Sequence, residues 1–383
     1  MKYLIILVTI FQLQCSTASN PPFRVSNNLF NEELPDDLGL VMAEGTETMT
    51  IFRPDSSDNC YNNGAVMCEF NNLLFCQWQS SAKDEDAVNT KVVYSCSNNG
   101  KNWKAPISLS IAIPNTYQTS GGWWKNGNTL IAFINVWPLK LEPKGGFTLY
   151  RTTTDGISWS GFKPVLMENG DTLKGVIEQD LHRLANGRIV GAAHFQPGLI
   201  VSPIYTDDPS GVKGWHRANF TPLAIKNNVS RELEPSLFIQ SNSNIVMVFR
   251  DQFSSYKRLA SVSTDNGESW SETILTNMPD SRSKQSAGNL PNRAAYLVGN
   301  PVSNKQRFPL AIALSRNGEV FTKAYLLRSG GSNLQPLRYE GKYKRAGYHY
   351  PKSMVAGNFL YVAYTTNKED VEYTRIPLDS LNL

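Results

Sequence analysis

Beyond its first twenty residues the sequence has no apolar run long enough to cross a membrane, and neither charge is in strong excess. The 37 basic residues outnumber the 33 acidic ones by only four, and no run of lysine and arginine and no RNA-binding aromatic motif occurs. We therefore expect no membrane span and no nucleic-acid partner, although an anionic ligand remains compatible with this charge. A phosphate loop, a dinucleotide motif and a nucleophile elbow are also absent from the sequence.

Cysteine and histidine are scarce, with five and four copies in 383 residues. Four cysteines lie close together in the first third of the chain: Cys60, Cys68, Cys76 and Cys96. Their spacing matches no zinc pattern, and the acidic segments DSSD and KDED lack EF-hand spacing, so we predict no metal and no cofactor. A two-residue turn at Asn71 and Asn72 would place Cys68 opposite Phe75, which argues against a Cys68–Cys76 disulfide. Other pairings of the four thiols stay open.

The first nineteen residues have the pattern of a secretory signal peptide. Lys2 precedes an apolar run from Leu4 to Leu13, and small residues around Ala18 fit a cleavage site. We expect a secreted or periplasmic protein, with a lipid anchor at Cys15 as the less favoured alternative. Residues 20–45 would then form an N-terminal extension, and residues 46–383 a single domain.

A short polar turn, STDNGESW at residues 263–270, recurs along the chain in altered form. Its final aromatic position is occupied successively by Trp103, Trp159, Trp215, Trp270 and Phe321, at intervals of 51 to 56 residues. A regular interval of this size indicates one supersecondary unit that repeats.

Each unit also contains a hairpin in which Asn, Gly or Ser residues precede an apolar strand, such as ANGRIVGAAHF and SNSNIVMVFRD. No long helical periodicity competes with the six hairpins of this type. We predict an all-β fold, a six-bladed β-propeller of four-stranded antiparallel blades. Seven blades are possible if residues 25–45 contain another. The last unit is one strand short, and the early segment ETMTIFRP could supply that strand and close the ring.

In such a propeller the start of each innermost strand and the end of each second strand meet at one face. The first column contains Tyr61 to Asn63, Thr119-Ser120, Glu178 to Asp180, Glu232 to Glu234, Gln285-Ser286 and His349-Tyr350. The second contains Gln77 to Gln79, Asn135 to Trp137, His194, Arg250-Asp251, Asn300 and Tyr364. Nearly all of these residues are polar or aromatic, which predicts an enzyme or sugar-binding site on the axis.

The eight-residue turn resembles the Asp-box of the sialidase superfamily, and the resemblance extends over most of the chain after residue 45. It implies a carboxylate clamp of Arg53, Arg250 and Arg307, with Gln179 as a further binding residue. It also implies a Tyr350 nucleophile, a Glu234 base and a general acid in the loop after the first hairpin, where Asp84 is the expected residue and Asp86 the alternative. Three features depart from the family pattern. The motif IFRPD lacks an isoleucine, an acidic-arginine pair is missing in CQWQSS, and two histidines stand in the ring.

Chemically, guanidinium groups would hold a sugar carboxylate through charge-assisted hydrogen bonds, each worth about 1.5–3 kcal/mol. A neutral tyrosine avoids the repulsion that a carboxylate nucleophile would meet, and a glutamate can take its proton. The first hypothesis is therefore an exo-acting glycoside hydrolase of the sialidase type, with an acidic oligosaccharide or polysaccharide as its substrate.

The histidines support a second hypothesis. His194 and His349, together with Tyr350 and Arg250, contain the groups needed to eliminate across C4 and C5 of a uronic acid. The enzyme would then be a polysaccharide lyase or an oligosaccharide dehydratase, for example on an ulvan-type algal polysaccharide. A third hypothesis, from another class, is a sugar-binding propeller without catalysis. The sequence does not decide the oligomeric state.

Overall fold

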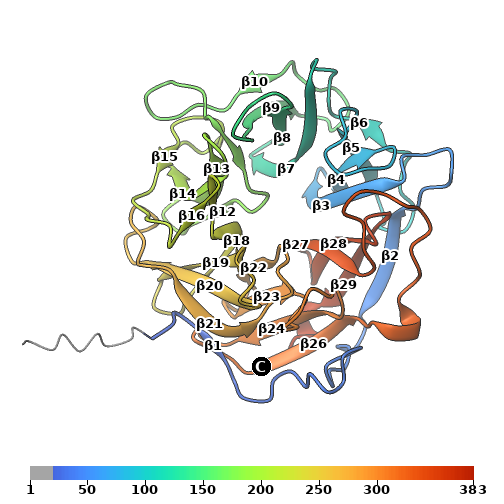
Figure 1. Cartoon of the computed structure of the whole chain (residues 1–383), viewed down its shortest axis with the longest axis vertical. Coiled ribbons are helices and arrows are strands. Elements are labelled where there is room, and N and C mark those ends of the chain that lie inside the picture. Colours follow the sequence, from blue (N-terminus) through green and yellow to red (C-terminus); the bar gives the residue numbers. More distant parts are fainter. Residues whose placement is uncertain (1–19) are drawn as a thin grey trace, which may run out of the picture.

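The computed structural model describes residues 20–383 (Figure 1). The predicted signal peptide and Cys15 lie outside the described residues. Six antiparallel sheets are arranged in a ring around a central axis, as Figure 1 shows in the view down that axis. The prediction of a six-bladed all-β propeller is confirmed.

The blades follow the chain, and the first-named strand of each lies nearest the axis. The first blade is formed by β3 (Tyr61–Phe70), β4 (Leu73–Ser81), β5 (Lys91–Ser97) and β6 (Ile107–Ser108). The second is formed by β7 (Thr116–Asn126), β8 (Thr129–Pro138), β9 (Phe147–Thr153) and β10 (Lys163–Pro164). The third is formed by β11 (Gly175–Ile177), β12 (His182–Arg183), β13 (Ile189–Phe195), β14 (Ile200–Thr206) and β15 (His216–Arg217). In the third blade the inner strand is interrupted, because β11 and β12 both pair with β13 on either side of residues 178–181.

The remaining blades have the same order. The fourth is formed by β18 (Glu232–Ile239), β19 (Ile245–Asp251), β20 (Lys257–Ser263) and β21 (Ile274–Pro279). The fifth is formed by β22 (Ser286–Asn289), β23 (Ala295–Gly299), β24 (Leu310–Ser315) and β26 (Lys323–Arg328). The sixth is formed by β27 (Tyr348–Ala356), β28 (Phe359–Thr366), β29 (Asp370–Pro377) and β2 (Glu47–Phe52). Two small pairs lie outside the blades, β1 (Arg24–Val25) with β25 (Val320–Phe321) and β16 (Ile225–Lys226) with β17 (Val229–Ser230).

The ring closes through β2, which pairs antiparallel with β29 as the outermost strand of the last blade. The segment that the sequence analysis assigned to this role therefore does close the propeller. Residues 25–45 add no seventh blade. Instead β1 pairs with β25, and Phe23 packs edge-on against Phe238 and Phe321 with ring centroids 5.7 and 5.4 Å away.

Strand side chains alternate between the two faces of a sheet, and both faces of a blade are covered by neighbouring blades. Strand β13 shows the consequence, because all seven of its residues are buried. Ile189 and Ala193 pack with Phe133 of the preceding blade, whereas Val190 packs with Met247 of the following one. This explains why the strand is a nearly continuous apolar run rather than an alternating one.

The hairpin between β3 and β4 has the predicted register, with Cys68 opposite Phe75. Cys60, Cys68, Cys76 and Cys96 are all free thiols, so no disulfide joins these four residues. The two helices of the described chain are single 3₁₀ turns, Gly331–Asn333 and Leu378–Ser380. No helix in residues 20–383 is long and apolar enough to cross a membrane.

The Asp-box turn is held by its own side chains. Ser263 Oγ accepts a hydrogen bond from the Gly267 N–H at 2.8 Å, and Asp265 Oδ1 accepts one from the Ser269 N–H at 2.9 Å. Gly267 has φ +90°, which suits glycine, and the Trp270 indole donates to the Gly267 carbonyl at 3.1 Å. The same Ser/Thr-to-glycine bond recurs in three other blades, at Ser97–Gly100, Thr153–Gly156 and Ser315–Gly318.

We predict that Asp265→Ala lowers the free energy of unfolding by about 1–3 kcal/mol, because backbone donors lose a charged acceptor. Burial by itself would raise the pKa of Asp265, but its hydrogen bonds with Ser269 lower it overall. The contribution of Asp265 should therefore be complete at neutral pH and disappear as the pH falls through its lowered pKa. Urea unfolding at neutral and acidic pH measures this difference. The exposed neighbour provides the control, Thr264→Ala, and equal midpoints for the two variants at neutral pH would contradict the prediction.

Candidate active site

Two adjoining hollows open on the face where the inner strands begin. The first, named here the polar hollow, has a volume of about 220 Å³ and is lined mainly by amide, hydroxyl and aromatic groups from the first three blades. The second, named here the basic hollow, has a volume of about 530 Å³ and is lined by seven lysines and arginines. Seven residues line both hollows, namely Glu85, Asp86, Lys144, Leu199, Leu233, Glu234 and Tyr350. The two hollows therefore form one continuous depression.

Backbone bulges place Glu234 and Tyr350 at the boundary between the hollows. The register of β18 shifts between Leu233 and Ser236, and that of β27 shifts between His349 and Lys352. Glu234 and Tyr350 are the left-handed residues of these bulges, with φ of 50° and 52°. A left-handed non-glycine residue costs about 1–3 kcal/mol and persists only where the surrounding structure enforces it. The equivalent bulges of β3 and β7 use glycine instead, at Gly64 and Gly122.

Tyr350, Glu234 and Arg250 are electrostatically coupled. Arg250 Nη1 donates to Glu234 Oε2 at 2.8 Å, and both side chains are largely buried. Burial by itself would raise the pKa of Glu234, but the charges of Arg250 and Lys284 lower it overall, so the carboxylate is ionised at neutral pH. Burial and then the Glu234 charge raise the pKa of Tyr350, so the phenol keeps its proton. The pair therefore consists of a protonated hydroxyl and an ionised carboxylate in one hollow.

Arg307 is a buried cation that forms no salt bridge with the carboxylates of residues 20–383. It is 7% exposed and lines the basic hollow, and its Nη2 donates to the Arg282 carbonyl at 2.9 Å. Its Nε and Nη1 atoms have no hydrogen-bond partner in the described part of the chain. Burial lowers the pKa of Arg307 to about 10. The Asn300 side chain holds this segment, because its amide donates to the carbonyls of Arg307 and Pro309 at 2.9 and 3.1 Å.

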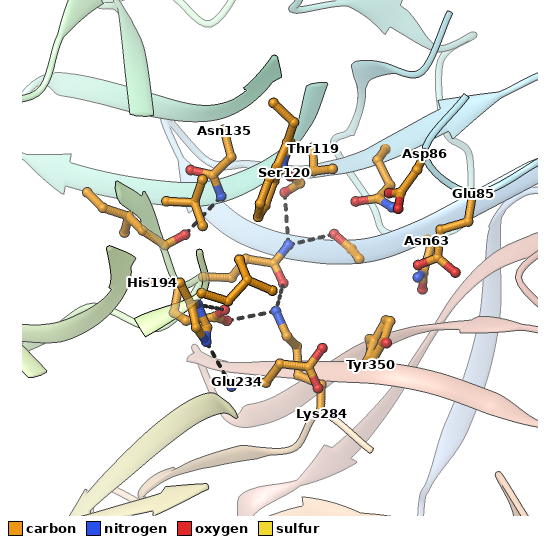
Figure 2. Close-up of a pocket in the computed structure, with 18 of the residues that line it drawn as sticks. Asn63, Glu85, Asp86, Thr119, Ser120, Asn135, His194, Glu234, Lys284 and Tyr350 are labelled. Carbon is orange, nitrogen blue, oxygen red and sulfur yellow. Dashed lines mark hydrogen bonds and ion pairs between the residues drawn. The ribbon is translucent and has the colours of Figure 1, made fainter. Parts of the chain in front are cut away.

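Three residues that line the polar hollow, Lys284, Glu178 and His194, are linked by polar contacts (Figure 2). Lys284 Nζ lies 2.7 Å from Glu178 Oε2, and His194 Nδ1 lies 3.2 Å from Glu178 Oε1. The other ring nitrogen of His194 accepts the Glu234 backbone N–H at 3.4 Å. Gln179 is tied down as well, since its amide donates to the Gly64 carbonyl at 2.8 Å and to Ser120 Oγ at 3.0 Å. Both His194 and Gln179 thus line the hollow with their polar atoms already engaged.

His349 lines the basic hollow but is almost completely buried. Its Nε2 contacts the Arg345 carbonyl at 2.9 Å. Burial, followed by the charges of Lys368 and Arg307, lowers the pKa of His349 well below its ordinary value. The imidazole is therefore neutral.

The loop after the first hairpin brings two of its three acids to the site. Asp86 and Glu85 line both hollows, and they pair with Lys144 at 2.7 Å and with Lys368 at 2.6 Å. Asp84 does not line either hollow, and its Oδ1 accepts the Lys342 backbone N–H at 2.8 Å. Of the two acids expected from the sequence, Asp86 is the one that faces the depression.

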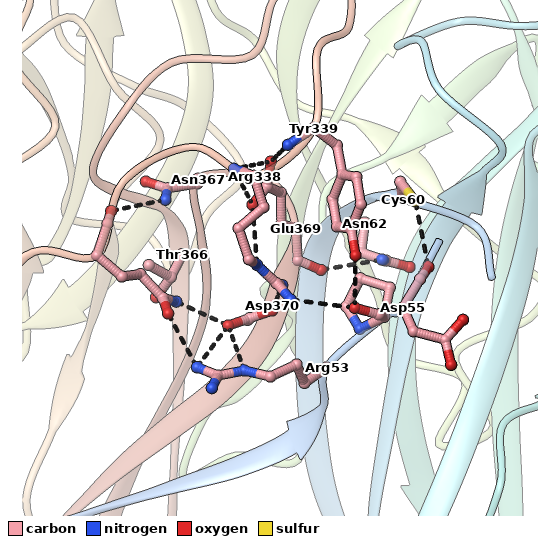
Figure 3. Close-up of polar contacts among 12 residues, drawn as sticks. Arg53, Asp55, Cys60, Asn62, Arg338, Tyr339, Thr366, Asn367, Glu369 and Asp370 are labelled. Carbon is pink, nitrogen blue, oxygen red and sulfur yellow. Dashed lines mark hydrogen bonds and ion pairs between the residues drawn. The ribbon is translucent and has the colours of Figure 1, made fainter. Parts of the chain in front are cut away.

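Arg53 lies apart from the depression (Figure 3). It follows β2, the outermost strand of its blade, and its guanidinium pairs with Asp370 at 2.9 Å and bonds to Gln335. The inner strand of the first blade begins only at Tyr61, and it lines the polar hollow with Asn63 and Gly64. The structure therefore brings Arg250, Arg307, Glu234 and Tyr350 together but leaves Arg53 outside.

Several lining residues were not among the expected site residues, namely Lys284, Arg282, Lys305, Arg345 and Lys368. Lys284 and Arg282 directly precede the column that begins at Gln285, so a search one turn upstream of each inner strand would have found them. Lys305 and Arg345 lie in long loops, whose path over the ring has no periodic signal in the sequence, and Lys368 lies in the short turn between β28 and β29. No group of three or more His, Cys, Asp or Glu side chains within residues 20–383 could hold a metal ion.

The structure is thus a six-bladed propeller with a charged depression on the face where its inner strands begin. The description of a BNR repeat-like domain matches residues 72–362, so the chain belongs to the BNR repeat-like domain family. No curated protein matches the chain.

Solved structures share the fold at low identity. A sialidase is 18% identical with a TM-score of 0.64, over 94% of this chain and 35% of its own, so the chain spans about a third of that protein. A Hadza microbial sialidase is 13% identical with a TM-score of 0.66, over 86% of this chain and 68% of its own. A protein of unknown function from Dyadobacter fermentans is 15% identical with a TM-score of 0.66, over 87% of this chain and 99% of its own.

We predict that Arg307→Met raises the free energy of unfolding by about 1–3 kcal/mol, because it removes a buried charge without a counter-ion. Urea unfolding at neutral pH measures the change. The exposed Arg293 offers a matched control, since Arg293→Met removes the same charge from a solvated position and should leave stability nearly unchanged. A loss of stability in Arg307→Met alone would show that the guanidinium stabilises the fold.

Proposed function

We propose that the chain is an exo-acting glycoside hydrolase that cleaves a carboxylate-bearing sugar from the end of a glycan. The observation that carries this proposal is the sharing of one hollow by Tyr350, Glu234, Arg250 and the unpaired Arg307. The similarity of the fold to solved sialidases supports the choice of chemistry. The proposed clamp differs from the one implied by the sequence, because Arg53 takes no part in it.

In the proposed reaction, Arg250 and Arg307 bind the sugar carboxylate through charge-assisted hydrogen bonds. Tyr350 Oη attacks the anomeric carbon while Glu234 accepts the phenolic proton. Asp86, which pairs with Lys144 as a carboxylate, must first take up a proton, which it then donates to the leaving glycosidic oxygen, and water releases the sugar from the tyrosine. The raised pKa of Tyr350 fits this scheme, since a protonated phenol is not repelled by the substrate and needs a base to react.

Elimination at a uronic acid is the second candidate, and the His194–Glu178 pair is the observation that favours it. In that reaction Arg307 would neutralise the carboxylate, while a tyrosine and a histidine would move protons at C5 and C4. His194 Nε2 already accepts a backbone hydrogen bond from Glu234, which leaves it no free lone pair toward a ligand. We therefore rank hydrolysis first.

The two candidates give different products. We expect incubation with sialosides and with uronic-acid oligosaccharides to release free acidic sugar, without the ultraviolet absorbance of a double bond conjugated to the carboxylate. The Tyr350→Phe variant should lose activity by about a thousandfold or more while keeping ligand affinity, because only the hydroxyl that reacts is removed. New absorbance without free sugar would establish elimination. Binding with no product from either substrate would indicate a sugar-binding propeller.

A histidine variant separates the two reactions a second time. We expect His194→Ala to reduce kcat less than about tenfold, because in the hydrolase scheme this ring only braces the Glu234 backbone and Glu178. In an eliminase that used His194 as an acid or base, the same variant would lose most of its activity. Steady-state kinetics on whichever substrate is turned over measures the effect.

A further inference from the structure

The basic hollow contains more positive charge than its own acids can balance. Its lining includes three acidic residues and seven basic ones: Glu85, Asp86, Glu234, Lys144, Arg250, Arg282, Lys305, Arg307, Arg345 and Lys368. Each acid has its own partner, since Lys144, Arg250 and Lys368 pair with the three carboxylates at 2.6 to 2.8 Å. Four cations, Arg282, Lys305, Arg307 and Arg345, have no carboxylate within 4.0 Å in the described part of the chain.

The four cations differ in their access to water. Lys305 and Arg345 are exposed, so solvent can balance their charges. Arg307 is buried and Arg282 is half-buried, and the Nε atoms of both are shielded from solvent and have no partner in residues 20–383. The nearby buried acid, Asp280, does not supply the missing charge, because it already pairs with Arg258 at 3.1 Å.

The arginines also act on one another. Burial lowers the pKa of both Arg282 and Arg307, and in each case the charge of Arg250 adds to the effect. Like charges held close together in a shielded place destabilise the protein unless a ligand neutralises them. One carboxylate can neutralise one of the two unpaired guanidinium groups, and the other would remain unbalanced.

We propose that the sugar bound in this depression carries two anionic groups, a carboxylate and a second group such as a sulfate ester or another carboxylate. Arg250 and Arg307 hold the first, and Arg282 is the specificity-determining residue for the second. The proposal rests on the function proposed above, because it assigns the substrate class of that site. The volume of about 530 Å³ lies within the range of small-molecule sites and leaves room for a substituted sugar.

Calorimetric titration of the full chain tests the proposal, with Tyr350→Phe in place so that the ligand is not consumed. The ligands are methyl sialoside and methyl glucuronide, their mono-O-sulfate isomers, and their mono-O-carboxymethyl ethers, all at one ionic strength. We expect at least one doubly charged ligand to bind about tenfold or more tightly than its singly charged parent. The sulfate and carboxymethyl series distinguish the two sources of the second charge.

Variants locate the effect. Arg282→Gln should abolish the preference for the doubly charged ligand over its parent, so that the two affinities become about equal. It should change the affinity for the parent ligand by less than about threefold, whereas Arg282→Lys should retain part of the preference. Arg293→Gln is the matched control, because this exposed arginine lies in the turn between β22 and β23, at the opposite end of the blade. Unfolding curves of each variant verify that the fold is intact.

Two results would overturn the proposal. Either every doubly charged ligand binds no more tightly than its parent, or Arg282→Gln weakens parent and doubly charged ligands equally, as for a clamp that uses all three arginines on one carboxylate. Neither result depends on turnover. Tighter binding of a doubly charged ligand without catalysis would refute only the proposed hydrolase. Catalysis without such tighter binding would refute only the proposal of a second anionic group.

Discussion

Every blade of this protein is covered on both faces by its neighbours, and the other features follow from that constraint. A strand such as β13 is buried along its whole length, and its side chains are apolar or small except for His194, which lies near the end that faces the depression. Polar residues are then confined to the places where inner strands begin and second strands end. Because six such places surround one axis, side chains from residue 63 to residue 350 meet in one depression. The packing of the blades thus assembles the site.

Within the depression the protein keeps charge that it does not neutralise. Glu85, Asp86 and Glu234 each pair with a cation, whereas Arg307 is buried and pairs with no carboxylate in the described residues. Left-handed backbone at Glu234 and Tyr350 adds a conformational cost at the same place. Native proteins place such costs where a ligand can offset them, which is the physical basis for assigning this depression to function.

The sequence was informative wherever a pattern repeats. The Asp-box turns, the hairpins, the register of Cys68 and the closing strand could all be predicted, because turn chemistry and strand alternation act over a few residues. Tyr350 and Glu234 could be placed for the same reason, since they begin inner strands. Arg53 could not, because the resemblance of its short motif does not tell where the segment lies, and here it directly follows β2, the outermost strand of its blade. The cations of the long loops gave no signal, since loop paths depend on contacts distant in sequence.

The strand that closes the ring comes from the beginning of the chain, and its partner β29 from the end. During synthesis, the edge of β2 therefore stays unpaired until nearly the whole polypeptide has been made. Blade six, which contributes Tyr350 and His349 to the depression, is completed last. A nascent chain thus contains five blades before it contains a complete site. Until then β2 is the blade strand most exposed to pairing with wrong partners.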